Sequence, residues 1–155
     1  MQHLDLSKPT RIECPIYKDD RGSLEVNLID GEFMPFSPKQ IITANCHKNT
    51  LKGLHLNYDM CKMIRVLNGG ILDIAVNFNS DNTHLTIYEF MLTQEDGWIF
   101  IPKGYGHGIL FFTESKVEYL LSEPYKDKSC KNIKLIDPFL KYSDALQKEF
   151  SNNSH

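Results

Sequence analysis

The stretch ILDIAVNF, residues 71–78, alternates between two kinds of position. One set of alternate positions holds only large apolar side chains, whereas the other set also holds the polar residues Asp73 and Asn77. A period of two is the repeat of a β-strand, in which successive side chains point to opposite faces. The pattern therefore predicts a strand that has a different environment on each of its two faces.

Short runs of the same kind recur along the chain, and turn-forming sequences such as DDRG, NGG, NSDN and PKGYG separate them. Gly, Pro, Asn and Asp favour chain reversal, each for its own backbone reason. Many short strands at such spacing are typical of an all-β barrel or sandwich. The predicted strands are residues 23–28, 40–45, 51–57, 62–67, 71–78, 85–92, 98–101, 108–112, 117–122 and 133–136.

One segment near the end of the chain, YSDALQKEF, has a helical pattern instead. Ser143 can cap such a helix, and Leu146 and Phe150 lie four residues apart on one face. A chain of 155 residues suits a single domain with a substantial core. We therefore expect one domain over residues 1–155, with its core at about 12–140 and a short C-terminal helix at about 141–150.

Composition excludes several classes of function. The formal net charge is −3, so there is no overall basic field for nucleic acid. No apolar run approaches the roughly 18 residues of a membrane span, and the N-terminus lacks the apolar core of a signal peptide. The four cysteines show no C-x-x-C spacing, which favours free thiols and a cytoplasmic protein.

The polar residues within the predicted strands raise the possibility of a site. In a barrel every strand has an inner and an outer face, so polar members of several strands can share one lumen. A single histidine on a strand is more often structural or on the surface, but several polar residues in one lumen favour a functional site. The candidates are His55, Asn57, Asp73, Asn77, His107 and Tyr119.

Four motifs, in this order and spacing, resemble the dTDP-4-dehydrorhamnose 3,5-epimerase family, whose members are cupin (jelly-roll) barrels. They are DDRG at 19–22, KGLHLN at 52–57, KMIRVLNGGILDIAV at 62–76 and IPKGYGHGI at 101–109. The resemblance covers roughly residues 12–140. It implies an all-β cupin fold, an isomerase of deoxysugar and polysaccharide biosynthesis, a nucleotide-sugar substrate and a homodimer.

The resemblance also implies catalytic roles. His55 matches the family's base, and Lys62 matches a lysine beside the developing enolate. Tyr119 matches the family's acid if one residue is deleted from the loop after His107. Two other interpretations stay open: Lys62 could be a surface residue at the start of a strand, and Tyr119 could be a core aromatic.

Supporting and binding residues follow from the same resemblance. His107 and Asp73 look like a second His–Asp pair of the family, or else a structural hydrogen bond. The family pairs its catalytic histidine with an aspartate near the C-terminus, for which Asp144 is the nearest match. The implied substrate-binding residues are Arg21, Asn45, Lys52 in place of the family's arginine, Asn57 in place of its glutamine, and Tyr125.

Metal-binding cupins typically carry His-x-His followed by a glutamate and a further histidine. Here the first motif reads His55-Leu56-Asn57, so the ligands are too few. We therefore predict no metal and no other cofactor. Three functions remain open: an epimerase at C3, C5 or both, a sugar nucleotide 3,4-ketoisomerase, and a non-catalytic cupin that binds a sugar nucleotide.

Overall fold

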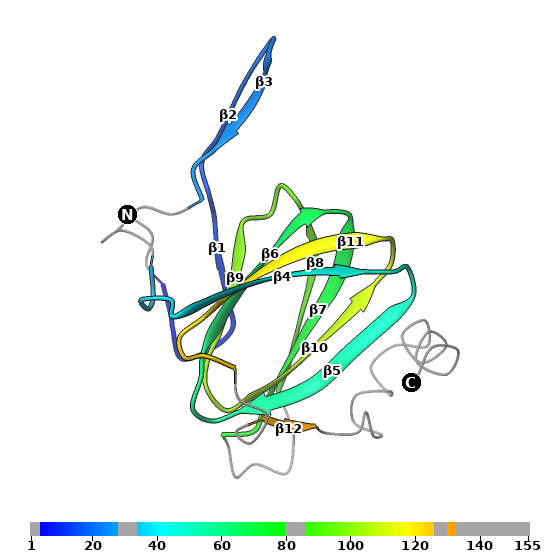
Figure 1. The fold of residues 1–155 in the computed structure, drawn as a ribbon. Helices are drawn as coiled ribbons and strands as arrows, with labels where there is room; N and C mark the ends of the chain where they lie inside the picture. The colour runs from blue at the N-terminus through cyan, green and yellow to red at the C-terminus, as the bar shows by residue number, and fades with distance from the viewer. Residues whose placement is uncertain (1–3, 28–33, 80–85, 126–129, 133–155) are drawn as a thin grey trace.

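The structure, a computed structural model, describes residues 4–27, 34–79, 86–125 and 130–132 (Figure 1). Within these ranges the chain forms strands, turns and loops and no helix, which confirms the predicted all-β class. Accordingly, no helix in the described part is long and apolar enough to cross a membrane. The predicted helix at 141–150 and the predicted strand at 133–136 lie outside the described residues.

Two antiparallel five-stranded sheets build the body of the fold. Sheet 1 has the strand order β1 (Thr10–Ile12), β9 (Trp98–Ile101), β6 (Lys62–Asn68), β11 (Ser115–Leu121) and β4 (Gln40–Cys46). Sheet 2 has the order β12 (Cys130–Asn132), β5 (Thr50–Asn57), β10 (Tyr105–Phe111), β7 (Gly70–Asn77) and β8 (Ile87–Thr93). The remaining pair, β2 (Ile16–Asp19) and β3 (Gly22–Glu25), forms a hairpin that projects away from the sheets (Figure 1).

The main core lies between the two sheets, where apolar side chains from both meet. Strand β7 shows how the alternation is used: Ile71 and Ala75 belong to this core, whereas Leu72, Ile74 and Val76 belong to a second apolar cluster. The two sets occupy opposite faces of the strand because the side-chain period is two. Asp73 shares the inner face with Ile71 and Ala75, so the predicted lumen contains a buried carboxyl group.

Most predicted strands are confirmed with shifts of a few residues at their ends. The largest correction concerns β10, which begins at Tyr105 rather than at residue 108. Gly104 and Gly106 flank this start, and glycine had suggested a loop rather than a strand. Strands β1, β2 and β12 were not predicted, because three or four residues are too short to show a period.

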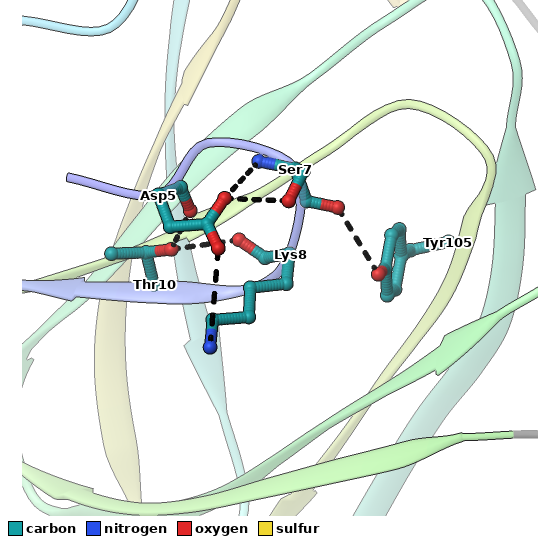
Figure 2. A network of polar contacts seen from close by, with 5 residues as sticks. All are labelled: Asp5, Ser7, Lys8, Thr10 and Tyr105. Carbon is teal, nitrogen blue, oxygen red and sulfur yellow. Dashed lines mark hydrogen bonds and ion pairs between the residues drawn. The ribbon is translucent and has the colours of Figure 1, made fainter.

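Tyr105 belongs to the main core, and Tyr88 packs against it with ring centroids 6.1 Å apart. The Tyr105 hydroxyl donates a hydrogen bond of 3.3 Å to the carbonyl oxygen of Ser7, as Figure 2 shows. Asp5 holds this N-terminal turn by accepting from the Ser7 N–H at 3.0 Å. Burial raises the pKa of Tyr105 to about 12. Tyr105 therefore fastens the N-terminal segment to the barrel and keeps its proton.

Candidate active site

A cavity of about 290 Å³ lies between the two sheets, and it gathers most of the polar residues that the sequence singled out. Sheet 1, sheet 2 and two connecting segments all contribute to its wall. The lining residues are Ile42, Ala44, Lys62, Tyr119 and Leu121 from sheet 1, Lys52, His55, Asn57, His107, Gly108 and Ile109 from sheet 2, and Met60 and Tyr125 from the connections.

His55 and His107 are directly opposite each other in the antiparallel pair of β5 and β10. Side chains directly opposite in such a pair lie on the same face, so both imidazoles face the cavity. The strands approach closely just beside them: a Cβ on Gly53 would lie 2.6 Å from the Cα of Gly108. Gly53 also has a φ of +118°, which L side chains rarely adopt. The glycines of the KGLH and HG motifs thus permit the backbone approach that places the two histidines.

His107 is buried and hydrogen-bonded to Asp73, with 2.5 Å between Nε2 and Oδ2. Burial lowers the pKa of His107 even though the Asp73 carboxylate opposes the shift, and the nearby Lys62 and His55 lower it further. The imidazole is therefore neutral near pH 7 and donates its Nε2–H to Asp73. Within the described ranges, the other oxygen of Asp73 is the buried side-chain atom that lacks a hydrogen-bond partner.

Lys62 and Tyr119 come from neighbouring strands of sheet 1. In the pairing of β6 with β11, Leu121 lies opposite Lys62 and Tyr119 lies opposite Ile64, so Lys62 and Tyr119 are diagonal neighbours on one face. Lys62 is only 9% exposed, which excludes a place on the protein surface. Burial is the largest cause that raises the pKa of Tyr119, followed by the charge of Asp73. Tyr119 therefore holds its proton throughout the neutral range.

Three further predicted residues line the cavity, two of them at its exposed mouth. Asn57 is buried in the wall, whereas Lys52 is exposed and Tyr125 is 48% exposed. Met60, in the connection from β5 to β6, completes the wall and was not predicted. A loop residue has no periodicity that could have revealed it.

Two predicted substrate-binding residues lie outside this cavity. Arg21 sits at the turn of the β2–β3 hairpin, where its 90% exposed side chain pairs with Asp19 at 2.7 Å. Asn45 is exposed on β4, and it lines a separate cleft of about 330 Å³ together with Asn68 and Lys116. Their roles stay predictions, because a single chain does not bring them to His55.

The sequence also bears on metal binding and on the partner of His55. Across the residues that the structure covers, no three His, Cys, Asp or Glu side chains are grouped so that they could hold a metal ion. Cys14, Cys46 and Cys61 are free thiols, as predicted. Asp144, the sequence match for the partner of His55, lies outside the described residues.

Comparison with known proteins gives one consistent result. The family model for dTDP-4-dehydrorhamnose 3,5-epimerase matches residues 3–152. The dTDP-4-dehydrorhamnose 3,5-epimerase of Escherichia coli (strain K12) is 26% identical over 129 residues, which span 76% of this chain and 70% of that protein.

Solved structures agree with the sequence match. The rmlC epimerase of Mycobacterium tuberculosis has a TM-score of 0.80 at 24% identity, over 92% of this chain and 76% of that one. ChmJ of Streptomyces bikiniensis, a 3'-monoepimerase in complex with dTDP-quinovose, has a TM-score of 0.76 at 21% identity, over 89% and 75% of the two chains. These likenesses confirm the predicted cupin-like barrel. By its family-model match, the chain belongs to the dTDP-4-dehydrorhamnose 3,5-epimerase family.

Proposed function

We propose that the protein is an isomerase that inverts C3, C5 or both in a nucleotide-linked 4-keto-6-deoxy sugar. One observation carries the proposal: His55 and Tyr119 line the same cavity from opposite sheets. Inversion requires a proton to leave one face of a carbon and another to arrive on the opposite face. Family membership supports the same reaction class, because its relatives include dTDP-4-dehydrorhamnose 3,5-epimerases.

The chemistry begins at the C4 ketone, which makes the hydrogens on its neighbouring carbons removable. His55 takes one of these protons as a general base, and the electron pair moves onto the ketone oxygen to form an enolate. Tyr119 then gives its phenolic proton to the carbon from the other side. Proton exchange with solvent returns the imidazolium and the phenolate to their starting states.

Lys62 stabilises the enolate. Its ammonium group is buried in a cavity whose other sheet-1 lining includes Ile42, Ala44 and Leu121, so water screens its charge poorly. A preorganised donor aimed at a developing oxyanion typically contributes about 10²–10³ in rate. Lys62 therefore supplies positive charge to a site in which His107 is neutral and the Asp73 carboxylate is hydrogen-bonded to His107.

The nucleotide is proposed to occupy the mouth of the cavity. Lys52 supplies an exposed cation suited to a phosphate, and Tyr125 supplies an aromatic ring on which a base can stack. Asn57, buried in the wall that His55 also lines, is proposed to contact the sugar. It also stands where sugar nucleotide 3,4-ketoisomerases, a related cupin class, usually carry the second histidine of His-x-His, and this supports the epimerase over the ketoisomerase.

The proposed active form is a homodimer, and the β2–β3 hairpin supports it. Tyr17 and Leu24 are large apolar side chains exposed on this hairpin, and an isolated two-stranded hairpin is only marginally stable in water. A second copy of the chain could cover these side chains and receive Arg21 at its own site. The mass in solution, measured by light scattering, tests this assembly.

The proposed reaction is tested by deuterium exchange into a dTDP-linked 4-keto-6-deoxy sugar in D₂O, with His55→Gln as the variant. Loss of a general base should reduce exchange by about 10²–10⁴. His47→Gln is the matched control, because that side chain is 91% exposed and pairs with Glu114. If His55→Gln keeps more than about a tenth of the activity, a residue other than His55 is the base.

A further inference from the structure

We infer that Gln40 is a positioning residue for nucleotide binding, which it serves by holding Tyr125 at the mouth of the cavity. The Oε1 atom of Gln40 accepts a hydrogen bond of 2.8 Å from the backbone N–H of Tyr125. The inference rests on the proposed function, because it assumes that the mouth receives the nucleotide. It adds a residue that has no contact with the reacting atoms and that the sequence motifs do not include.

Residues 121–125 lead out of β11, and Leu121 and Tyr125 among them line the cavity; we call this stretch the mouth segment. Its first residues are fixed by the backbone. The Leu121 carbonyl oxygen accepts from the Lys39 N–H at 2.8 Å, and the Ser122 N–H donates to the Cys61 carbonyl oxygen at 3.0 Å. The Ser122 Oγ in turn accepts from the Cys61 N–H at 2.9 Å.

The far end of the mouth segment is fixed by side chains of residues 39 and 40. Lys39 pairs with Glu123 at 2.9 Å, but both side chains are exposed, so this pair contributes little. Pro124 has no N–H to donate, and its fixed φ stiffens the backbone between Glu123 and Tyr125. The hydrogen bond from the Tyr125 N–H to Gln40 is therefore a direct constraint on the backbone position from which the aromatic ring extends.

The backbone of Tyr125 is held by this hydrogen bond, whereas the residue is 48% exposed. Tyr125 also lines the cavity. An aromatic side chain in this state offers a flat apolar face to a ligand. Stacking depends on where the ring is held, and binding is tighter when that position is set before the ligand arrives. Gln40 fixes the backbone from which the ring extends, and it does so from β4, a strand whose Ile42 and Ala44 line the cavity.

The test uses Gln40→Met, which keeps the length of the side chain and removes the acceptor. Its matched control is Gln94→Met, the same chemical change at an exposed glutamine in the turn between β8 and β9. Binding of dTDP and of inorganic pyrophosphate is measured by calorimetry, and thermal unfolding is recorded for every variant. Pyrophosphate lacks the base, so it reports the phosphate contacts alone.

We expect Gln40→Met to weaken dTDP binding on the order of 3- to 10-fold, the range for one hydrogen bond. Pyrophosphate affinity and the affinity of Gln94→Met for dTDP should stay within about twofold of wild type. In turnover, KM should rise while kcat is unchanged, because the lost contact is equal in ground and transition states. Gln40→Glu, measured at roughly 0.5 M salt to screen its charge, should restore dTDP binding because a carboxylate also accepts.

A double-mutant cycle with Tyr125→Ala separates positioning from a general structural effect. If Gln40 acts through the ring, Gln40→Met should change dTDP affinity by less than about twofold once the ring is gone. Unchanged dTDP affinity in Gln40→Met, equal losses for dTDP and pyrophosphate, or full additivity in the cycle would each overturn the inference. Failure of the wild-type protein to bind dTDP at all would instead refute the proposed function on which it rests.

Discussion

Replacing Tyr119 with phenylalanine should separate two events that the wild-type enzyme couples: proton exchange with solvent and inversion. The substitution removes one hydroxyl and keeps the ring, which packs against the main core. In the described structure that hydroxyl makes no hydrogen bond, so its removal strands no partner, and the fold should lose less than about 1 kcal/mol. His55, on the opposite sheet, is untouched.

The kinetic effect should be much larger than the effect on stability. A lost general acid typically costs about 10²–10⁴ in rate, which corresponds to about 2.7–5.4 kcal/mol of barrier. Exchange through His55 should continue, because the base can return deuterium to the face from which it removed hydrogen. Burial raises the pKa of Tyr119, so the wild-type phenol stays protonated near neutral pH and can act as a proton donor.

The assay follows both events in one sample. A dTDP-linked 4-keto-6-deoxy sugar is incubated in D₂O with wild type or Tyr119→Phe, and NMR reports deuterium at C3 and C5 and the configuration of each carbon. The variant should show exchange without inversion. Inversion at the wild-type rate would identify Tyr119 as a core aromatic, and loss of both events together with an unchanged melting temperature would show that it does not act as a separate acid.

Three further outcomes follow from the same cavity. Lys62→Met should lower kcat by about 10²–10³ in the same assay with little change in stability, whereas a change below about tenfold would remove Lys62 from the enolate site. His107 should titrate in an NMR experiment below the ordinary imidazole value near 6.5, since burial lowers its pKa. Because the unfolded chain then binds a proton that the folded chain does not, this histidine's contribution to the free energy of unfolding should fall as pH drops below about 6.5; titration of His107 at 6.5 or above would contradict this. Dialysis against EDTA should leave activity unchanged, and a loss that Zn²⁺ or Fe²⁺ reverses would show that the site needs a metal.

Alternation along single strands was enough to predict the fold class and most of the lumen. The polar positions of residues 71–78 and the shared face of His55 and Asn57 follow from a period of two, which is local information. Asn45 could have been placed by the same rule, because Ala44 next to it faces the cavity and neighbouring side chains point to opposite faces. The family match assigned Asn45 a role but not a face.

Other features depend on contacts between distant segments and could not be predicted. The pairing of His55 with His107 rests on a register shift beside Gly108, and register is set across strands rather than along one. The short strands β1 and β12 form because a longer neighbour, β9 or β5, offers them hydrogen-bonding groups, and β2 pairs with the equally short β3. The bond from Tyr125 to Gln40 joins residues 85 positions apart and leaves no pattern in the sequence.

Deuterium incorporation by the wild-type protein tests the central claim most directly. The protein is incubated in D₂O with a dTDP-linked 4-keto-6-deoxy sugar, and NMR follows C3, C4 and C5. A cavity with a base on one wall and an acid on the other should place deuterium at C3, C5 or both, with inversion at the exchanged carbon and the carbonyl still at C4. A carbonyl that moves to C3 would make the protein a ketoisomerase, and binding without any exchange would make it a non-catalytic cupin; either result would contradict the assignment of His55 and Tyr119 as an epimerase's base and acid.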